Sequence, residues 1–262
     1  MAAVESTLGR ARAAGRPALV TYVTGGIRAD WTDLLAAMID AGADAVEIGL
    51  PFSDPMLDGH TIQQASDAAL RRGATPAAIL DQLGQVASGT APLIAMAYAN
   101  HAYRHGLAGY CRQLAGAGIS GTIIPDLPVA EAGGYLDAAR EAGLDATLMV
   151  TPATPENDIE AIAARTHGFL YVMSVMATTG TTSESADTER WAVAARARRR
   201  SPRPVLIGFG IDTPDRAADA VRHADGVIVA SALMRRVLDG ASSADIGRDV
   251  ARLRAAVDQA RR

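Results

Sequence analysis

Two carboxylic acids in the first quarter of the chain are the leading candidates for chemistry. Glu47 lies in the apolar run "ADAVEI" (residues 43–48), and Asp58 follows eleven residues later in the loop sequence "GLPFSDPMLDG" (49–59). A carboxylate among apolar side chains is costly unless it is paired, protonated or used in a reaction. We therefore expect Glu47 to move protons, and the alternative is a structural, hydrogen-bonded carboxylate. Asp58 precedes a glycine, and Asp-Gly is also a common turn pair.

Small-residue segments in the last third of the chain have the composition of an anion site. They are "ATTGTTS" (177–183), "GFGIDTPDR" (208–216) and "VASALM" (229–234), and each follows an apolar run. Glycines such as Gly210 let backbone N–H groups approach an anion, and Ser231 adds a hydroxyl. Each segment alone is a weak signal. Together they predict that the substrate is a phosphorylated small molecule.

Repeated strand and helix patterns must position these residues. Eight short apolar runs alternate with alanine-rich helical segments, at residues 18–23, 43–48, 92–97, 120–125, 146–150, 169–174, 204–209 and 225–230. Most of these runs are continuously apolar, which is typical of parallel strands covered on both faces. The repetition predicts an α/β fold, a (β/α)₈ barrel that forms one domain over residues 1–262; an open doubly wound sheet is the alternative. In such a barrel the active site lies at the carboxyl ends of the strands, where the candidate residues would meet.

Composition and charge exclude several classes of protein. The chain has 262 residues, and 49% of them are hydrophobic, enough for a full globular core. A formal net charge of −4 argues against a nucleic-acid surface, although residues 196–200 read "RARRR". We interpret that cluster as the solvated end of a helix. The sequence contains no apolar run long enough for a membrane span or a signal peptide.

Lysine, cysteine and histidine usage narrows the chemistry further. All 25 basic residues are arginine, which excludes Schiff-base catalysis by a lysine amine. Cys111 is the only cysteine, so an intrachain disulfide is excluded and a reducing, cytoplasmic location is expected. Of the five histidines only His101 and His105 share helical i, i+4 spacing, so we expect no metal site. No cofactor is expected either.

The sequence motifs resemble the tryptophan synthase alpha subunit family. The segment "DAGADAVEIGLPFSDPMLDGHTIQ" (40–63, with its first Asp at 40) is similar to the family signature. Shorter motifs follow in the family's order over nearly the whole chain, namely "YVTGG", "YAN", "PDLPVAE", "TPATPE", "YVMS…TTG" and "GFGI". The resemblance implies a (β/α)₈ barrel without a cofactor. It also implies cleavage of indole-3-glycerol phosphate to indole and glyceraldehyde 3-phosphate.

The resemblance assigns roles residue by residue. Glu47 matches the acid–base carboxylate and Asp58 the aspartate that holds the indole N–H. The matching substrate-binding positions are Tyr171, Thr179, Gly180, Phe209, Gly210, Ala230 and Ser231. The positions that match the face toward a beta subunit, the partner in a heterotetramer, are Pro51, Asp54, Pro55, Asn100 and Pro128.

Departures from the family pattern keep other functions open. His60 replaces the usual proline after Asp-Gly, Ala177 and Thr178 replace Gly and Val, and Ala230 replaces the glycine before the phosphate-site serine. "GGIR" stands where "G-x-P" is usual after the first strand. One alternative is a lyase that releases indole without a beta partner. Another is a non-catalytic subunit that binds a phosphorylated ligand and activates such a partner. A third is an isomerase or lyase for a different phosphorylated sugar.

Overall fold

The computed structural model describes residues 3–85, 91–173, 184–208 and 210–260. The strands are β1 (Ala18–Thr24), β2 (Ala45–Gly49), β3 (Leu93–Met96), β4 (Gly121–Ile123), β5 (Asp145–Val150), β6 (Leu170–Val172), β7 (Val205–Ile207) and β8 (Gly226–Val229). They form a closed barrel in chain order, in which each strand is parallel to the next and β8 pairs with β1. The prediction of a (β/α)₈ barrel is confirmed. The closure excludes the doubly wound sheet.

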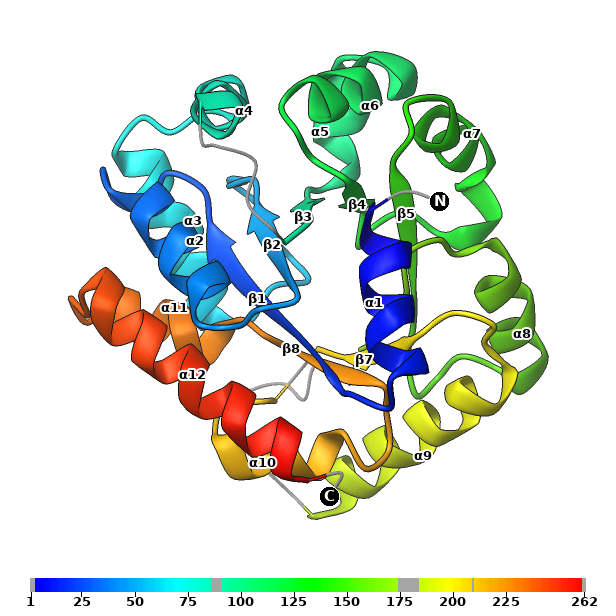
Figure 1. Cartoon of the computed structure of the whole chain (residues 1–262). Coiled ribbons are helices and arrows are strands. Elements are labelled where there is room, and N and C mark those ends of the chain that lie inside the picture. The colour runs from blue at the N-terminus through cyan, green and yellow to red at the C-terminus, as the bar shows by residue number, and fades with distance from the viewer. Residues whose placement is uncertain (1–2, 86–90, 174–183, 209, 261–262) are drawn as a thin grey trace.

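Helices surround the barrel (Figure 1). They are α1 (Ala3–Ala13), α2 (Trp31–Asp40), α3 (His60–Arg71), α4 (Pro76–Gln85), α5 (Ala99–Arg104), α6 (Leu107–Gly116), α7 (Gly133–Glu141), α8 (Glu156–Arg165), α9 (Glu184–Arg200), α10 (Pro214–Ala220), α11 (Ser231–Leu238) and α12 (Ser243–Gln259), with a 3₁₀ turn at Val129–Glu131. Within the described ranges, no helix is both long enough and apolar enough to cross a membrane.

The strand interior and the strand exterior are both apolar, which explains the continuous hydrophobic runs in the sequence. One buried cluster lies between the strands and the outer helices. A second fills the barrel and includes Val20, Ile94 and Leu206. Because side chains alternate along a strand, both faces of every strand must be apolar to pack against these two clusters.

Helix α1 departs from the outer ring. Its Val4 and Leu8 are buried in the interior cluster together with Ala18 and Phe169, which stand at or just before the starts of β1 and β6. The helix therefore covers the amino-terminal end of the barrel, and in Figure 1 it lies over the ring of strands instead of outside it. The carboxyl-terminal end is left for the site.

Candidate functional site

Glu47 lies inside the barrel on β2. Its neighbours in strand register are Tyr22 on β1 and Ile94 on β3, and only 1% of the residue is exposed. Its Oε2 atom is buried and has no hydrogen-bond partner among the described residues. A structural carboxylate would be expected to have its oxygen atoms bonded. The geometry therefore opposes the purely structural interpretation of this side chain.

The surroundings of Glu47 favour its neutral form. Burial is the main cause, and the negative charge of Asp58 adds to it; together they raise the pKa of Glu47 to about 8. A buried carboxyl group holds its proton because the low-dielectric interior disfavours the charged form. At neutral pH Glu47 is therefore mostly protonated.

Asp58 stands at the end of the loop between β2 and α3, directly before the first turn of α3. Burial raises the pKa of Asp58 to about 6, and a hydrogen bond with Tyr98 opposes that shift. The Tyr98 hydroxyl also accepts the Leu57 N–H at 3.0 Å. From the other side, Gln63 Nε2 of α3 donates to the Asp58 carbonyl oxygen at 2.9 Å. The charge of Asp58 thus contributes to the electrostatic environment of Glu47.

Two buried tyrosines complete the barrel mouth, Tyr22 on β1 and Tyr171 on β6. Gly49 and Gly208 make room for them, because an added Cβ would lie 1.8 Å from the Tyr22 hydroxyl and 2.1 Å from the Tyr171 hydroxyl. Burial raises the pKa of both hydroxyls, and the charges of Glu47 and Asp58 add to the effect. Both tyrosines therefore remain protonated and can donate hydrogen bonds to a ligand.

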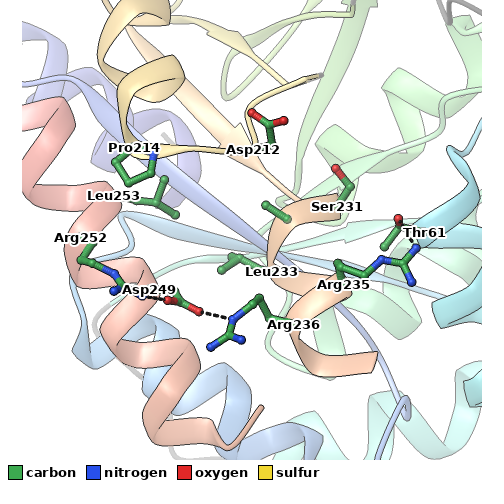
Figure 2. Close-up of a pocket in the computed structure, with 11 residues that line it drawn as sticks. Thr61, Asp212, Pro214, Ser231, Leu233, Arg235, Arg236, Asp249, Arg252 and Leu253 are labelled. Carbon is green, nitrogen blue, oxygen red and sulfur yellow. Dashed lines mark hydrogen bonds and ion pairs between the residues drawn. The ribbon is translucent and has the colours of Figure 1, made fainter. Parts of the chain in front are cut away.

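The predicted anion site lies where β7 and β8 end. Ala230 is the N-cap residue of α11 and Ser231 its first residue; Ala230 makes no side-chain cap bond. Gly210 has a φ of 71°, in the left-handed region that favours glycine. Ser231 is exposed, and it lines one end of a cavity of about 680 Å³ between α11 and α12 (Figure 2).

Three of the predicted substrate-binding residues, Thr179, Gly180 and Phe209, lie outside the described residues. The same is true of Ala177 and Thr178, which depart from the family pattern.

The residues predicted to meet a partner gather around the β2–α3 loop and α5. Asp54, Asn100 and Pro128 are exposed, Pro55 is half-buried and Pro51 is buried. Two large apolar side chains are also exposed there, Met56 at 79% and Tyr103 at 54%. These two side chains are suited to contact another protein, since large exposed apolar groups are enriched at interfaces.

One group among the described residues has metal-ligand geometry, and it lies at the opposite end of the barrel. It consists of Glu5, Asp145 and His167. Arg203 Nε is 3.0 Å from Glu5 Oε2, and Asp145 Oδ2 accepts the Glu5 N–H at 2.8 Å. These bonds already occupy the carboxylates and attach α1 to the barrel, so we interpret the group as structural.

Sequence reasoning did not select Tyr22 or Tyr98 as site residues. Both belong to sequence motifs named above, Tyr22 to "YVTGG" and Tyr98 to "YAN". Tyr98 stands two residues after the end of β3, at the carboxyl end of the barrel, and that position was a usable signal. Its contact with the Asp58 loop spans 41 residues of sequence and could not be inferred from local pattern.

Comparisons with known proteins agree with this architecture. Residues 8–261 match the family model described as "Tryptophan synthase alpha chain". The tryptophan synthase alpha chain of Roseiflexus castenholzii is 42% identical over 246 residues, which cover 89% of this chain and 91% of that protein. The alpha chain of Acidothermus cellulolyticus is 40% identical over 250 residues, with 93% and 92% covered.

Solved structures give the same result. Tryptophan synthase subunit alpha from Legionella pneumophila superposes with a TM-score of 0.89 at 30% identity and covers 99% of both chains. A chain of the Mycobacterium tuberculosis tryptophan synthase gives a TM-score of 0.89 at 31% identity and 98% coverage of both chains. With matches along nearly its entire length in both sequence and structure, this chain belongs to the tryptophan synthase alpha chain family.

Proposed function

We propose that this protein cleaves indole-3-glycerol phosphate to indole and glyceraldehyde 3-phosphate. The observation that carries the proposal is the buried carboxyl group of Glu47 in the barrel mouth, whose Oε2 has no hydrogen-bond partner among the described residues and whose pKa is raised in part by the charge of Asp58. Two acids whose pKa values differ can act as proton donor and charge stabiliser at the same pH. Membership of the family supplies the identity of the substrate.

The proposed route begins with the proton on Glu47. Glu47 donates it to C3 of the indole ring, which turns the ring into a cationic electron sink. The carboxylate of Glu47 then removes the proton from the glycerol hydroxyl next to the scissile bond. The hydroxyl carbon becomes the aldehyde of glyceraldehyde 3-phosphate, and the electrons of the broken carbon–carbon bond return to the ring. Glu47 ends with a proton, so the cycle is balanced.

Asp58 serves the cationic intermediate in this proposal. Its carboxylate accepts a hydrogen bond from the indole N–H and stabilises the positive charge that develops on the ring. With a pKa of about 6, Asp58 is mostly ionised at neutral pH, while Glu47 is mostly neutral. Tyr98 supports this role, because its hydroxyl bonds the same loop at Leu57. We propose that the Tyr171 hydroxyl donates a hydrogen bond to the glycerol portion of the substrate.

The substrate's phosphate is proposed to bind at the amino terminus of α11. The free backbone N–H groups of a helix amino terminus can donate to an anion, and the helix dipole favours negative charge there. Gly210, Ala230 and Ser231 are the contributors within the described residues. Thr179, Gly180 and Phe209 remain predicted contributors on the basis of the resemblance.

A tryptophan synthase beta subunit is the proposed protein partner. Asp54, Asn100 and Pro128 are exposed beside the site, and Met56 and Tyr103 extend the same surface with apolar area. A partner that buries this surface would contact the loop that carries Asp58. A cytoplasmic location is part of the proposal, because the single cysteine suits a reducing compartment.

The test is direct detection of indole by mass spectrometry after indole-3-glycerol phosphate is added to the purified chain, with and without a beta subunit. We expect indole in both reactions and a faster rate with the partner. No indole in either reaction would overturn the proposed function. Full activity that a beta subunit leaves unchanged would instead favour a lyase that works alone.

A further inference from the structure

Arg235 on α11 links the proposed phosphate-binding helix to α3. Its Nη2 atom donates to Thr61 Oγ1 and to Gln64 Oε1, both at 2.9 Å. Thr61 and Gln64 belong to the first two turns of α3, whereas Arg235 lies more than 170 residues later in the sequence. Figure 2 shows the Arg235 side chain extending from α11 toward Thr61. The bonds therefore join two elements on which different parts of the proposed site stand.

The first turns of α3 are connected in turn to the loop that carries Asp58. Gln63 Nε2 donates to the Asp58 carbonyl oxygen at 2.9 Å and lies 3.5 Å from the Pro55 carbonyl oxygen. Asp58 is separated from α3 only by the N-cap residue Gly59. A shift of α3 therefore moves the backbone of Asp58 directly. These hydrogen bonds form a continuous path from α11 through Arg235, α3 and Gln63 to Asp58.

The neighbouring arginines of the same cavity do not share this arrangement. Arg236 and Arg252 both contact Asp249 of α12, Arg236 with its Nε at 3.1 Å from Asp249 Oδ2. Arg236 joins α11 to α12 on the side away from α3, whereas the contact of Arg252 with Asp249 lies within α12 (Figure 2). The bonds that Arg235 makes to Thr61 and Gln64 are instead to neutral acceptors, so their function is to fix a position and not to neutralise a carboxylate.

We propose that Arg235 is a positioning residue, which couples the occupation of the α11 amino terminus by phosphate to the placement of Asp58. An anion bound at that terminus holds α11 in one position, and the Arg235 bonds transmit this position to the first turns of α3. Asp58 is then held where it can accept the indole N–H. The inference rests on the proposed function, because it needs both a phosphate and an indole in the site.

The experiment measures indole binding by equilibrium dialysis, with and without saturating inorganic phosphate. Coupled sites change each other's affinity by the same factor, typically 5- to 150-fold. For the wild-type chain we expect phosphate to tighten indole binding by about fivefold or more. In Arg235→Met this ratio should fall to about one. Arg235→Lys should restore part of it, since an ammonium group can still reach one of the two acceptors.

Two further variants keep the test decisive. Arg236→Met removes a charge from the same helix and cavity but no bond to α3, so it should keep the wild-type ratio. Thr61→Val combined with Gln64→Leu removes both acceptors and leaves α11 unchanged. Its ratio of indole affinities with and without phosphate should also fall to about one. This double variant replaces Arg235→Met if Arg235→Met does not fold. A structural defect alone would weaken indole binding equally with and without phosphate, and would not change the ratio.

The outcomes separate this inference from the proposed function. If the wild-type chain releases indole from indole-3-glycerol phosphate but Arg235→Met keeps the wild-type ratio, the inference is overturned and the function stands. A wild-type ratio near one, or an equal loss in Arg236→Met, also overturns the inference. If the wild-type chain releases no indole even with a beta subunit, both are overturned.

Discussion

Buried acids occur at both ends of this barrel, but their surroundings are opposite. At the amino-terminal end, Asp225 is 1% exposed, accepts from Arg198 Nε at 2.9 Å and from the Val205 N–H at 3.1 Å, and has Arg12 at 3.6 Å. Asp44 likewise contacts Arg254 at 3.0 Å and accepts the Leu19 N–H at 2.9 Å. At the carboxyl-terminal end, Glu47 keeps a buried oxygen without a partner in the described part of the chain.

The difference shows how one residue type serves two purposes in the same fold. A carboxylate that contacts arginines and N–H groups joins elements of the fold together. A buried carboxyl group without such partners keeps its proton and destabilises the fold when that proton is lost. The barrel thus places acids that join elements at the starts of its strands and the acid with the proposed reactive role nearer their ends, as expected where loops at one end carry the function.

The largest predicted effect is on turnover. Glu47→Gln keeps the shape of the side chain but cannot exchange a proton, so kcat/KM for indole release should fall by about 10³-fold or more. Steady-state assays with indole-3-glycerol phosphate measure it. Asp225→Asn is the matched control, because it changes a buried acid at the other end of the barrel and should keep more than half of the wild-type turnover. Equal losses of turnover in the two variants would contradict the proposed difference between the two ends of the barrel.

A second prediction uses the same substitution to compare stability across pH. The pKa of Glu47 is raised from 4.5 to about 8, so between these values the folded chain holds a proton that the unfolded chain has released. The contribution of the protonated Glu47 to the wild-type free energy of unfolding should therefore be fully present below pH 4.5 and decrease as the pH rises toward 8. Glu47→Gln lacks this dependence. The difference in free energy of unfolding between Glu47→Gln and wild type should therefore shift in favour of Glu47→Gln by about 2 to 4 kcal/mol when the pH is raised from 5.5 to 8.5.

Urea unfolding at the two pH values measures this difference. If the difference in free energy of unfolding between Glu47→Gln and wild type is the same at both pH values, Glu47 is already ionised in the folded chain. In that case the proposed role of Glu47 as proton donor at neutral pH would be wrong.

The third prediction concerns the acids at the amino-terminal end. Asp225→Asn leaves the guanidinium groups of Arg198 and Arg12 without their carboxylate, so the free energy of unfolding should decrease by about 2 to 3 kcal/mol. Urea unfolding at pH 7 measures the loss. A change below about 0.5 kcal/mol, the range of an ordinary surface substitution, would show that these ion pairs do not stabilise the barrel.

The smallest predicted effect comes from Tyr98. Removing its hydroxyl in Tyr98→Phe takes one hydrogen bond from Asp58 and one acceptor from the Leu57 N–H. We expect kcat/KM to fall about tenfold, the cost of one hydrogen bond to a charged group. The pH profile of kcat/KM should rise near the Asp58 pKa of about 6 and fall near the Glu47 pKa of about 8.

The direction of the change in that profile is the sharper test. The Tyr98 hydrogen bond lowers the pKa of Asp58, so its removal should move the acid side of the profile to higher pH. An unchanged profile with the same tenfold loss would indicate that Tyr98 acts on the loop backbone and not on the Asp58 carboxylate.

The sequence was sufficient for the fold because each strand is short, apolar on both sides and followed by a helix. Strand positions agreed with the structure, while strand ends did not: the run at residues 120–125 contains only the three strand residues of β4. The ends depend on where pairing with the neighbouring strand stops, and an apolar pattern carries no such signal.

The site was only partly predictable, for a related reason. Glu47 was visible because a carboxylate in an apolar run is unusual. Tyr98 and Arg235 look ordinary in the sequence, the first as a tyrosine after a strand and the second as a basic residue near a helix end. Their importance comes from contacts across 41 and 174 residues, and such contacts exist only in the folded chain.

Helix α1 also determines at which end of the barrel a ligand enters and leaves. Because Val4 and Leu8 cover the amino-terminal side of the packed interior with hydrocarbon, the site is approached from the carboxyl-terminal rim. Whatever enters must leave by the same rim, and a protein docked on that rim would receive the departing aromatic fragment before bulk water does.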